Sequence, residues 1–78
     1  MATVKLFAQL REIAGTKEAT VEGDTVAEVV ANAAAGFGTE FQALLKHCRI
    51  WLNGEPCDGS EAVEEPAEIA ILPPVSGG

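Results

Sequence analysis

The order in which hydrophobic periodicity changes along the chain is the feature that most limits its fold. Residues 3–8 and 18–22 alternate between apolar and polar side chains, which predicts two half-buried strands. In residues 26–33, apolar side chains recur at helical spacing instead. Alternation returns at residues 49–53 and 68–72. The pattern predicts one main helix set between two pairs of short strands.

Capping and stop signals predict the limits of the helical part. Thr25 stands three residues before Glu28, which is the spacing of a capping box, so the main helix is predicted to begin there. Glycine accepts the left-handed conformation that closes a helix, so residues 36–38 (Gly-Phe-Gly) predict its end. Thr39 and Gln42 then predict the start of a short second helix.

Three further signals divide the rest of the chain. A helical turn is predicted at residues 10–14 and is stopped by Gly15. Asn53 and Gly54 form the strongest short turn signal in the sequence. Pro73 and Pro74 end the last strand, because proline has no N–H to donate to a strand ladder.

These elements predict an α+β fold, a roll of the β-grasp type. Its mixed sheet of four to five strands carries the main helix across one face, with the short second helix in addition. The first two strands pair antiparallel, and the last strand takes the centre of the sheet so that Ile69 and Ile71 are both buried. We expect residues 1–72 to form this domain and residues 73–78 to form an extended, flexible tail.

The same alternation predicts which side chains the sheet turns away from the helix. Val4 and Leu6 share the inner face, so Phe7 points outward, and Trp51 and Leu72 follow by parity. So small a chain has few residues to cover a second sheet face, and Trp is common among interface anchors. We predict that Phe7, Trp51 and Leu72 form a partner-binding patch. The alternative is that a loop folds over them.

The charge of the chain restricts its classes of partner. Twelve Asp and Glu residues against five Lys and Arg give a net charge of −7, which disfavours binding to a phosphate backbone. No apolar run approaches the roughly 20 residues of a bilayer span, and the first residues lack the pattern of a secretory signal. We expect a cytoplasmic protein that binds other proteins and neither nucleic acid nor membrane.

Half of the acidic residues stand in one stretch that leads into the last strand. Two interpretations remain open: the stretch steers the chain toward a basic partner surface, or it is an ordinary solvated loop. The six residues are Glu55, Asp58, Glu61, Glu64, Glu65 and Glu68.

The chain offers little catalytic chemistry of its own. Cys48 and Cys57 lack the spacing of a redox or zinc motif, and His47 is the one histidine, so no metal site is predicted. We interpret the cysteines as reduced structural thiols, with a persulfide relay or a disulfide as alternatives. The sequence contains no catalytic triad or dinucleotide motif. We expect no catalytic residues within the domain and no bound cofactor.

The residues after the last strand combine a stiff root with a tip of almost bare backbone: Pro73, Pro74, Val75, Ser76, Gly77 and Gly78. Six residues reach at most about 20 Å, which is enough to enter another protein's active site. Glycine passes a channel where larger side chains clash. The Gly78 carboxylate is a poor electrophile, so we expect ATP to convert it to an acyl-adenylate that a sulfur or amine nucleophile attacks.

Two segments carry a resemblance to a known family. Residues 4–15 (VKLFAQLREIAG) and 69–78 (IAILPPVSGG) resemble the small subunits of molybdopterin synthases, which are ubiquitin-like sulfur carriers. The middle of the chain also follows the family pattern, in residues 25–29 (TVAEV) and 52–55 (LNGE). The resemblance therefore extends over essentially the whole chain and supports the predicted fold.

The resemblance implies a sequence of partners and reactions. An enzyme related to the ubiquitin-activating family would adenylate Gly78 with ATP, and the carboxylate would become a thiocarboxylate. The tail would then enter the large subunit of the synthase and give its sulfur to cyclic pyranopterin monophosphate. Phe7 and Leu72 match positions where family members place apolar residues against both partners. Pro56 departs from the larger aliphatic residue that relatives have.

Other functions remain open from the residues alone. The chain could donate sulfur in another pathway, such as thiamine or cysteine synthesis, or be a modifier joined to lysines. The element at residues 7–15 favours the molybdopterin carrier over the thiamine carrier, which usually lacks it. A modifier would have the same tail, and an interaction domain without a carrier role is a more distant alternative.

Overall fold

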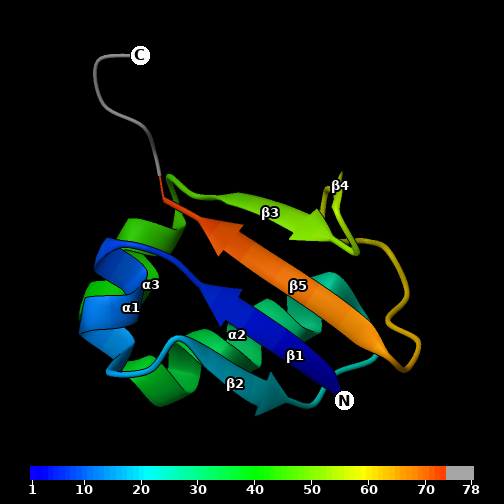
Figure 1. Cartoon of the computed structure of the whole chain (residues 1–78), viewed down its shortest axis with the longest axis horizontal. Helices are drawn as coiled ribbons and strands as arrows, with labels where there is room; N and C mark the ends of the chain where they lie inside the picture. The colour runs from blue at the N-terminus through cyan, green and yellow to red at the C-terminus, as the bar shows by residue number, and fades with distance from the viewer. Residues whose placement is uncertain (74–78) are drawn as a thin grey trace.

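The strands and helices follow one another in the predicted order (Figure 1). The structure, a computed structural model, describes residues 1–73; residues 74–78 lie outside the described part. The elements are β1 (Ala2–Leu6), α1 (Gln9–Ala14), β2 (Glu18–Val21), α2 (Val26–Phe37), α3 (Thr39–Leu45), β3 (Arg49–Leu52), β4 (Glu55–Pro56) and β5 (Ala67–Leu72).

The strands form one five-stranded mixed sheet in the order β2-β1-β5-β3-β4. β1 pairs antiparallel with β2, and β3 pairs antiparallel with both β4 and β5. β1 and β5 are parallel, which is possible because the whole helical part of the chain lies between them. The predicted α+β roll is confirmed, and β5 occupies the centre of the sheet as its two isoleucines require.

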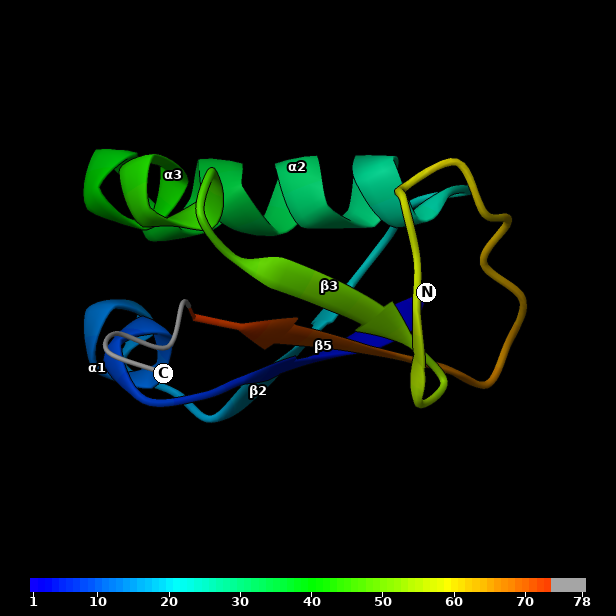
Figure 2. The same ribbon diagram turned by 90° about the horizontal axis from the view of Figure 1, so that it is seen from above.

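The core lies between the sheet and the long helix. Figure 2 shows α2 and α3 in a layer over one face of the sheet, while no helix covers the opposite face of the described part. Ile69 and Ile71 of β5 are fully buried, as are Val29 of α2 and Phe41 of α3. Leu10 of α1 is also fully buried. The period-two and helical patterns of the sequence therefore meet in one apolar layer.

The first turn of α2 is capped from two directions. The Thr25 hydroxyl accepts a hydrogen bond from the Glu28 N–H at 3.2 Å, as the capping box predicts. The Glu28 carboxylate accepts one from the N–H of Asp24, one residue before the expected partner. The carbonyls of Glu61 and Gly59 accept the N–H groups of Val26 and Ala27. The loop before β5 therefore closes over the start of α2.

The end of the main helix predicted at residues 36–38 is confirmed, but the predicted capping of the next helix by Thr39 and Gln42 is wrong. Gly36 lies inside α2, which continues to Phe37, and Gly38 with φ 99° makes the break. Phe37 stays helical because its ring packs on Phe41 with centroids 5.0 Å apart. Thr39 is the first helical residue of α3 and makes no cap hydrogen bond. Gln42 instead donates its side-chain amide to the Ala34 carbonyl at 3.2 Å.

The turn between β3 and β4 is confirmed at Asn53 and Gly54. Both have positive φ, 50° and 85°, as the two-residue hairpin that pairs Leu52 with Glu55 requires. Asn53 also fastens this hairpin to the neighbouring strand. Its side-chain oxygen accepts the Glu68 N–H at 2.9 Å, and its own N–H donates to the Glu68 carbonyl at 2.8 Å.

The first strand is shorter than predicted, because the chain turns at Ala8. β1 ends at Leu6, and Ala8 has φ 51°, a conformation that side chains with a Cβ rarely adopt. The Phe7 carbonyl accepts the Leu10 N–H at 3.1 Å across this turn. α1 begins at once at Gln9 and ends at Gly15, as expected. Phe7 therefore stands at the corner between β1 and α1.

Candidate functional site: the outer sheet face and the root of the tail

The strand register places apolar residues next to one another on the outer face of the sheet. Lys5 is opposite Ala70, Ala70 is opposite Trp51, and Trp51 is opposite Pro56. In β5 these outward positions alternate with buried Ala67, Ile69 and Ile71. With Glu18 of β2 opposite Lys5, one continuous row therefore crosses all five strands of the helix-free face, and it is apolar at Ala70, Trp51 and Pro56.

A second row contains the other two residues of the predicted patch. Leu72 is opposite Arg49 in the antiparallel pair of β5 and β3. Leu6 is opposite Ile71 in the parallel pair of β1 and β5, so Phe7 and Leu72 each lie one residue beyond the same pair. Phe7, Trp51 and Leu72 are all half-buried. We call Phe7, Trp51, Ala70, Leu72 and Pro56 the outer-face patch.

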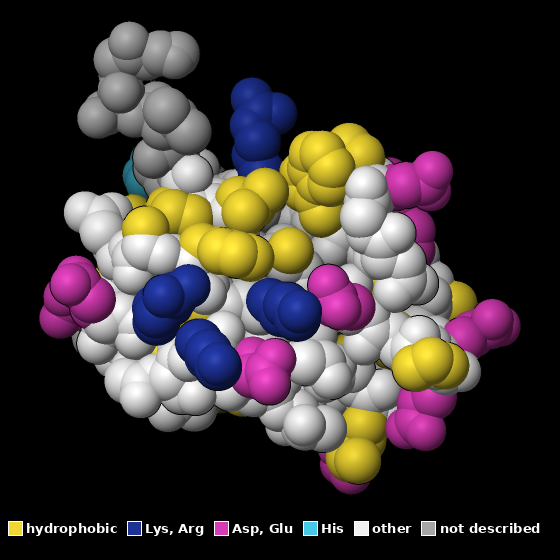
Figure 3. Space-filling model, viewed as in Figure 1, with side chains coloured by type: hydrophobic (Ala, Val, Ile, Leu, Met, Phe, Trp, Pro, Cys, Tyr) yellow, Lys and Arg dark blue, Asp and Glu magenta, His cyan; other side chains and the backbone are white. Residues whose placement is uncertain are grey.

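Basic side chains flank the outer-face patch (Figure 3). Figure 3 shows the yellow hydrophobic cluster with Lys and Arg side chains both above and below it. Phe7 shares a hollow of about 240 Å³ with Lys5, Arg11 and Lys17, and also with Glu18. On the other side, Trp51 shares a hollow of about 320 Å³ with Arg49 and Asp58. Sequence reasoning missed this basic rim, although Lys5 and Arg49 fall on the outward parity of their strands.

The tail root leaves the domain beside the patch. β5 ends at Leu72, and half-buried Pro73 follows at the same end of the sheet where β1 leads into Phe7. The remaining predicted tail residues lie outside the described part: Pro74, Val75, Ser76, Gly77 and Gly78. Because β1 and β5 are parallel, the sheet brings the patch and the tail root to one edge.

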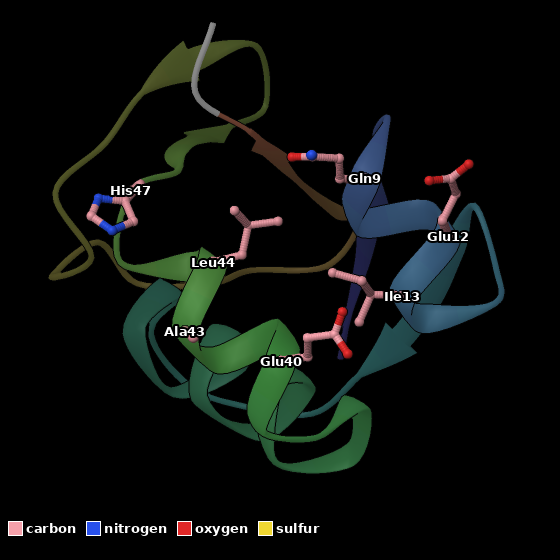
Figure 4. Close-up of a pocket in the computed structure, with 7 residues that line it drawn as sticks. All are labelled: Gln9, Glu12, Ile13, Glu40, Ala43, Leu44 and His47. Carbon is pink, nitrogen blue, oxygen red and sulfur yellow. The ribbon is translucent and has the colours of Figure 1, made fainter. Parts of the chain in front are cut away.

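A separate pocket of about 490 Å³ lies between α1 and α3 (Figure 4). In the close-up, Ile13 and Leu44 reach toward each other from the two helices, and Glu40 points toward α1. His47 lies at the far side of the pocket. The lining holds the carboxylates of Glu12 and Glu40 and the imidazole of His47, but no Ser, Thr, Cys or Lys side chain.

Both thiols pack against the core as free cysteines. The Cys48 Sγ–H donates to the Leu44 carbonyl at 3.3 Å, and the Cys57 Sγ–H donates to the Ile50 carbonyl at 3.4 Å. Burial raises the pKa of the Cys48 thiol. Burial, and then the negative charge of Glu61, raise the pKa of the Cys57 thiol. A raised pKa keeps a thiol protonated and unreactive, which agrees with a structural role.

The acidic stretch uses several carboxylates to order its own loop. The Glu61 carboxylate accepts the N–H groups of Asp58 and Gly59. Asp58 accepts the hydroxyl and the N–H of Ser60, and these bonds lower the pKa of its carboxyl group. Glu65 pairs with the N-terminal amine at 3.0 Å. These contacts favour the structural interpretation of the stretch over the steering one.

Within residues 1–73, the structure offers neither a metal site nor a membrane-spanning helix. No cluster of three His, Cys, Asp or Glu side chains is placed to hold a metal ion there. None of the helices in that range combines the length and the apolar character that crossing a membrane requires.

A family model described as the ThiS family matches residues 4–78 of the sequence. The chain belongs to the ThiS family. This membership confirms the resemblance that the sequence showed to ubiquitin-like sulfur carriers, and it agrees with the β-grasp sheet.

Two ThiS-like relatives match nearly the full chain. The molybdopterin synthase sulfur carrier subunit of Chlamydomonas reinhardtii is 36% identical over 85 residues, covering 96% of this chain and 95% of the relative. Small archaeal modifier protein 1 of Haloferax volcanii is 35% identical over 85 residues, covering 95% and 97%. The solution structure of small archaeal modifier protein 1 from Methanosarcina acetivorans has a TM-score of 0.85 at 32% identity, covering 99% and 95%.

Proposed function

We propose that this protein is the sulfur-carrier subunit of a molybdopterin synthase. The match that carries the proposal is the Chlamydomonas carrier subunit, 36% identical over nearly the full length of both chains. In this role the protein is a substrate and a donor, and the catalytic groups belong to its partners. The partners are a ubiquitin-activating type of adenylating enzyme and the large subunit of the synthase.

The proposed reaction takes place at Gly78. The activating enzyme joins the Gly78 carboxylate to the AMP part of ATP and releases pyrophosphate. Sulfide-level sulfur from a donor then displaces AMP, so one carboxylate oxygen is replaced by sulfur. In the large subunit, the thiocarboxylate transfers this sulfur to cyclic pyranopterin monophosphate. Water restores the carboxylate for the next cycle.

The arrangement of the described residues supports this role. Phe7 and Leu72 lie one residue beyond the same pair of the parallel strands, and Pro73 follows directly. A partner that contacts the outer-face patch therefore has the root of the tail beside its contact surface. Docking at this edge leaves residues 73–78 to reach a site up to about 20 Å away.

Intact mass spectrometry tests the carrier role. The purified chain is incubated with ATP, a sulfide source and the adenylating enzyme, and we expect a gain of about 16 Da, the exchange of one oxygen for sulfur. Transfer is then followed with the large subunit and its substrate. A variant without Gly78 is the control and should show no gain. If the wild-type chain keeps its original mass under these conditions, the carrier role is wrong.

A modifier role is the second candidate, because the chain is 35% identical to small archaeal modifier protein 1 of Haloferax volcanii over nearly both full lengths. In that role a lysine amine attacks the acyl-adenylate in place of sulfur and forms an isopeptide bond. The same incubation with cell lysate distinguishes the two functions. Lysine conjugates of the wild-type chain without a thiocarboxylate intermediate would favour the modifier.

A further inference from the structure

The basic residues of this acidic chain are gathered around its outer-face patch. Lys5, Arg11 and Lys17 share the hollow of Phe7, and Arg49 lines the hollow of Trp51. The chain has only five Lys and Arg residues against twelve Asp and Glu. The remaining one, Lys46, caps the end of α3 in the helical layer. Four of the five basic residues therefore line the two hollows of the outer sheet face.

Carboxylates also lie on this face, since Glu18 lines the hollow of Phe7 and Asp58 lines the hollow of Trp51, but most of its cations form no ion pair. Lys5 pairs with Glu68 at 3.6 Å, while Arg11, Lys17 and Arg49 form no ion pair within residues 1–73. All three of these side chains are exposed. The acidic loop instead uses Asp58 and Glu61 for its own hydrogen bonds. Solvated cations beside half-buried apolar residues are the usual composition of an interface rim around its centre.

We infer that the outer sheet face docks on an acidic protein surface, one that sets carboxylates around an apolar pocket. The inference rests on the proposed function, because the partner in question is one that takes the tail. Leu72 stands opposite Arg49 and directly before Pro73, so that partner must meet the basic rim. The acidic stretch alone suggested a partner with a basic surface, whereas the basic rim predicts a partner with an acidic one.

Charge reversal on the two sides of the patch tests this inference. Lys17→Glu and Arg49→Glu change exposed side chains, and Lys46→Glu makes the same change on the helical layer as a matched control. Binding of each variant to the purified adenylating enzyme and to the large subunit is measured at low and high salt. We expect Lys17→Glu with Arg49→Glu to weaken binding about tenfold or more at low salt, mainly through a slower association rate.

Salt dependence, folding controls and the Lys46→Glu variant distinguish the outcomes of the charge-reversal experiment. High salt should reduce the difference in affinity between wild type and the double variant, because salt screens the same electrostatic attraction that the charge reversal abolishes. Thermal unfolding midpoints show that the variants are folded. Equal loss in Lys46→Glu, or no loss in the double variant, overturns the acidic-surface inference and leaves the carrier role intact. A wild-type chain that binds neither enzyme overturns both proposals.

Discussion

Asn53 shows how much one side chain can contribute to a fold of this size. It holds the positive φ that the hairpin turn needs, and its amide oxygen accepts the backbone N–H of Glu68 in the central strand. Asparagine tolerates this conformation better than most residues with a Cβ. The residue therefore links the turn, the edge strand and the centre of the sheet.

We expect Asn53→Ala to lower the free energy of unfolding by about 1–2 kcal/mol. The loss has two sources: strain at positive φ and the missing acceptor for the Glu68 N–H. Urea unfolding measures it. Asn53→Asp retains the acceptor and tolerates the same φ, so it should unfold close to wild type. Unfolding of Asn53→Ala at the wild-type urea concentration would contradict this account.

The two thiols should react slowly in the folded protein. Burial raises the pKa of both, so they stay protonated at pH 8, and iodoacetamide should alkylate them much faster in denaturant. Mass spectrometry of Cys48→Ser and Cys57→Ser assigns the rate to each thiol. Because burial raises the pKa of both thiols in the folded state, the associated stability is present below the pKa of the unfolded thiols and is lost as the pH rises through the folded pKa. Alkylation at equal rates in both states would refute this.

At the scale of the element, hydrogen bonds decide where helices begin. The sequence pairs Thr25 with Glu28 and Thr39 with Gln42 in the same way, yet only Thr25 caps its helix. Helix α2 ends at Phe37, and Gly38, one residue before Thr39, takes the N-cap position of α3. Thr39 is therefore already helical, and its hydroxyl makes no cap hydrogen bond. Local pattern could not separate the two cases, because the packing of Phe37 on Phe41 fixes the position of the break.

This difference gives a paired prediction. Thr25→Ala removes the acceptor for the Glu28 N–H and should lower the free energy of unfolding by about 1 kcal/mol. Thr39→Ala changes the same chemical group at a position without a cap bond and should have a much smaller effect. Urea unfolding of the two variants provides the comparison. Equal losses would show that the hydroxyl of Thr25 has no special role.

Strand parity was the most informative part of the sequence. Alternation alone predicted that Ile69 and Ile71 are buried and that β5 takes the centre of the sheet, and both are confirmed. It failed at Ala8, which continues the alternation but turns with φ 51°. The basic rim was missed because Arg11 and Lys17 lie outside strands, and only the folded chain brings them to Phe7.

At the scale of the whole molecule, stability depends on the strand that joins the two strand pairs of the sheet, β1 with β2 and β3 with β4. β5 alone connects β1 with β3, and its inward residues are fully enclosed. A domain of this length has a free energy of unfolding of about 4–12 kcal/mol. Loss of contacts at β5 therefore affects both halves of the sheet together.

Ile71→Ala should lower the free energy of unfolding by about 2–5 kcal/mol, because the side chain is fully buried and a cavity remains. Leu72→Ala, on the outer face, should have a smaller effect on stability. Amide hydrogen exchange checks the cooperative part of the prediction. In Ile71→Ala, β1 and β3 should lose protection by similar amounts, and a loss confined to one of them would contradict the central role of β5.

The position of β5 has a consequence for folding during translation. Of the described strands, the one that completes the sheet is the last that the ribosome makes. We expect a chain that stops before residue 67 to hold two unconnected strand pairs, without Ile69 and Ile71 to complete the core, and to be open to proteolysis. A copy that folds fully has therefore been translated as far as the root from which the sulfur-carrying tail is proposed to extend.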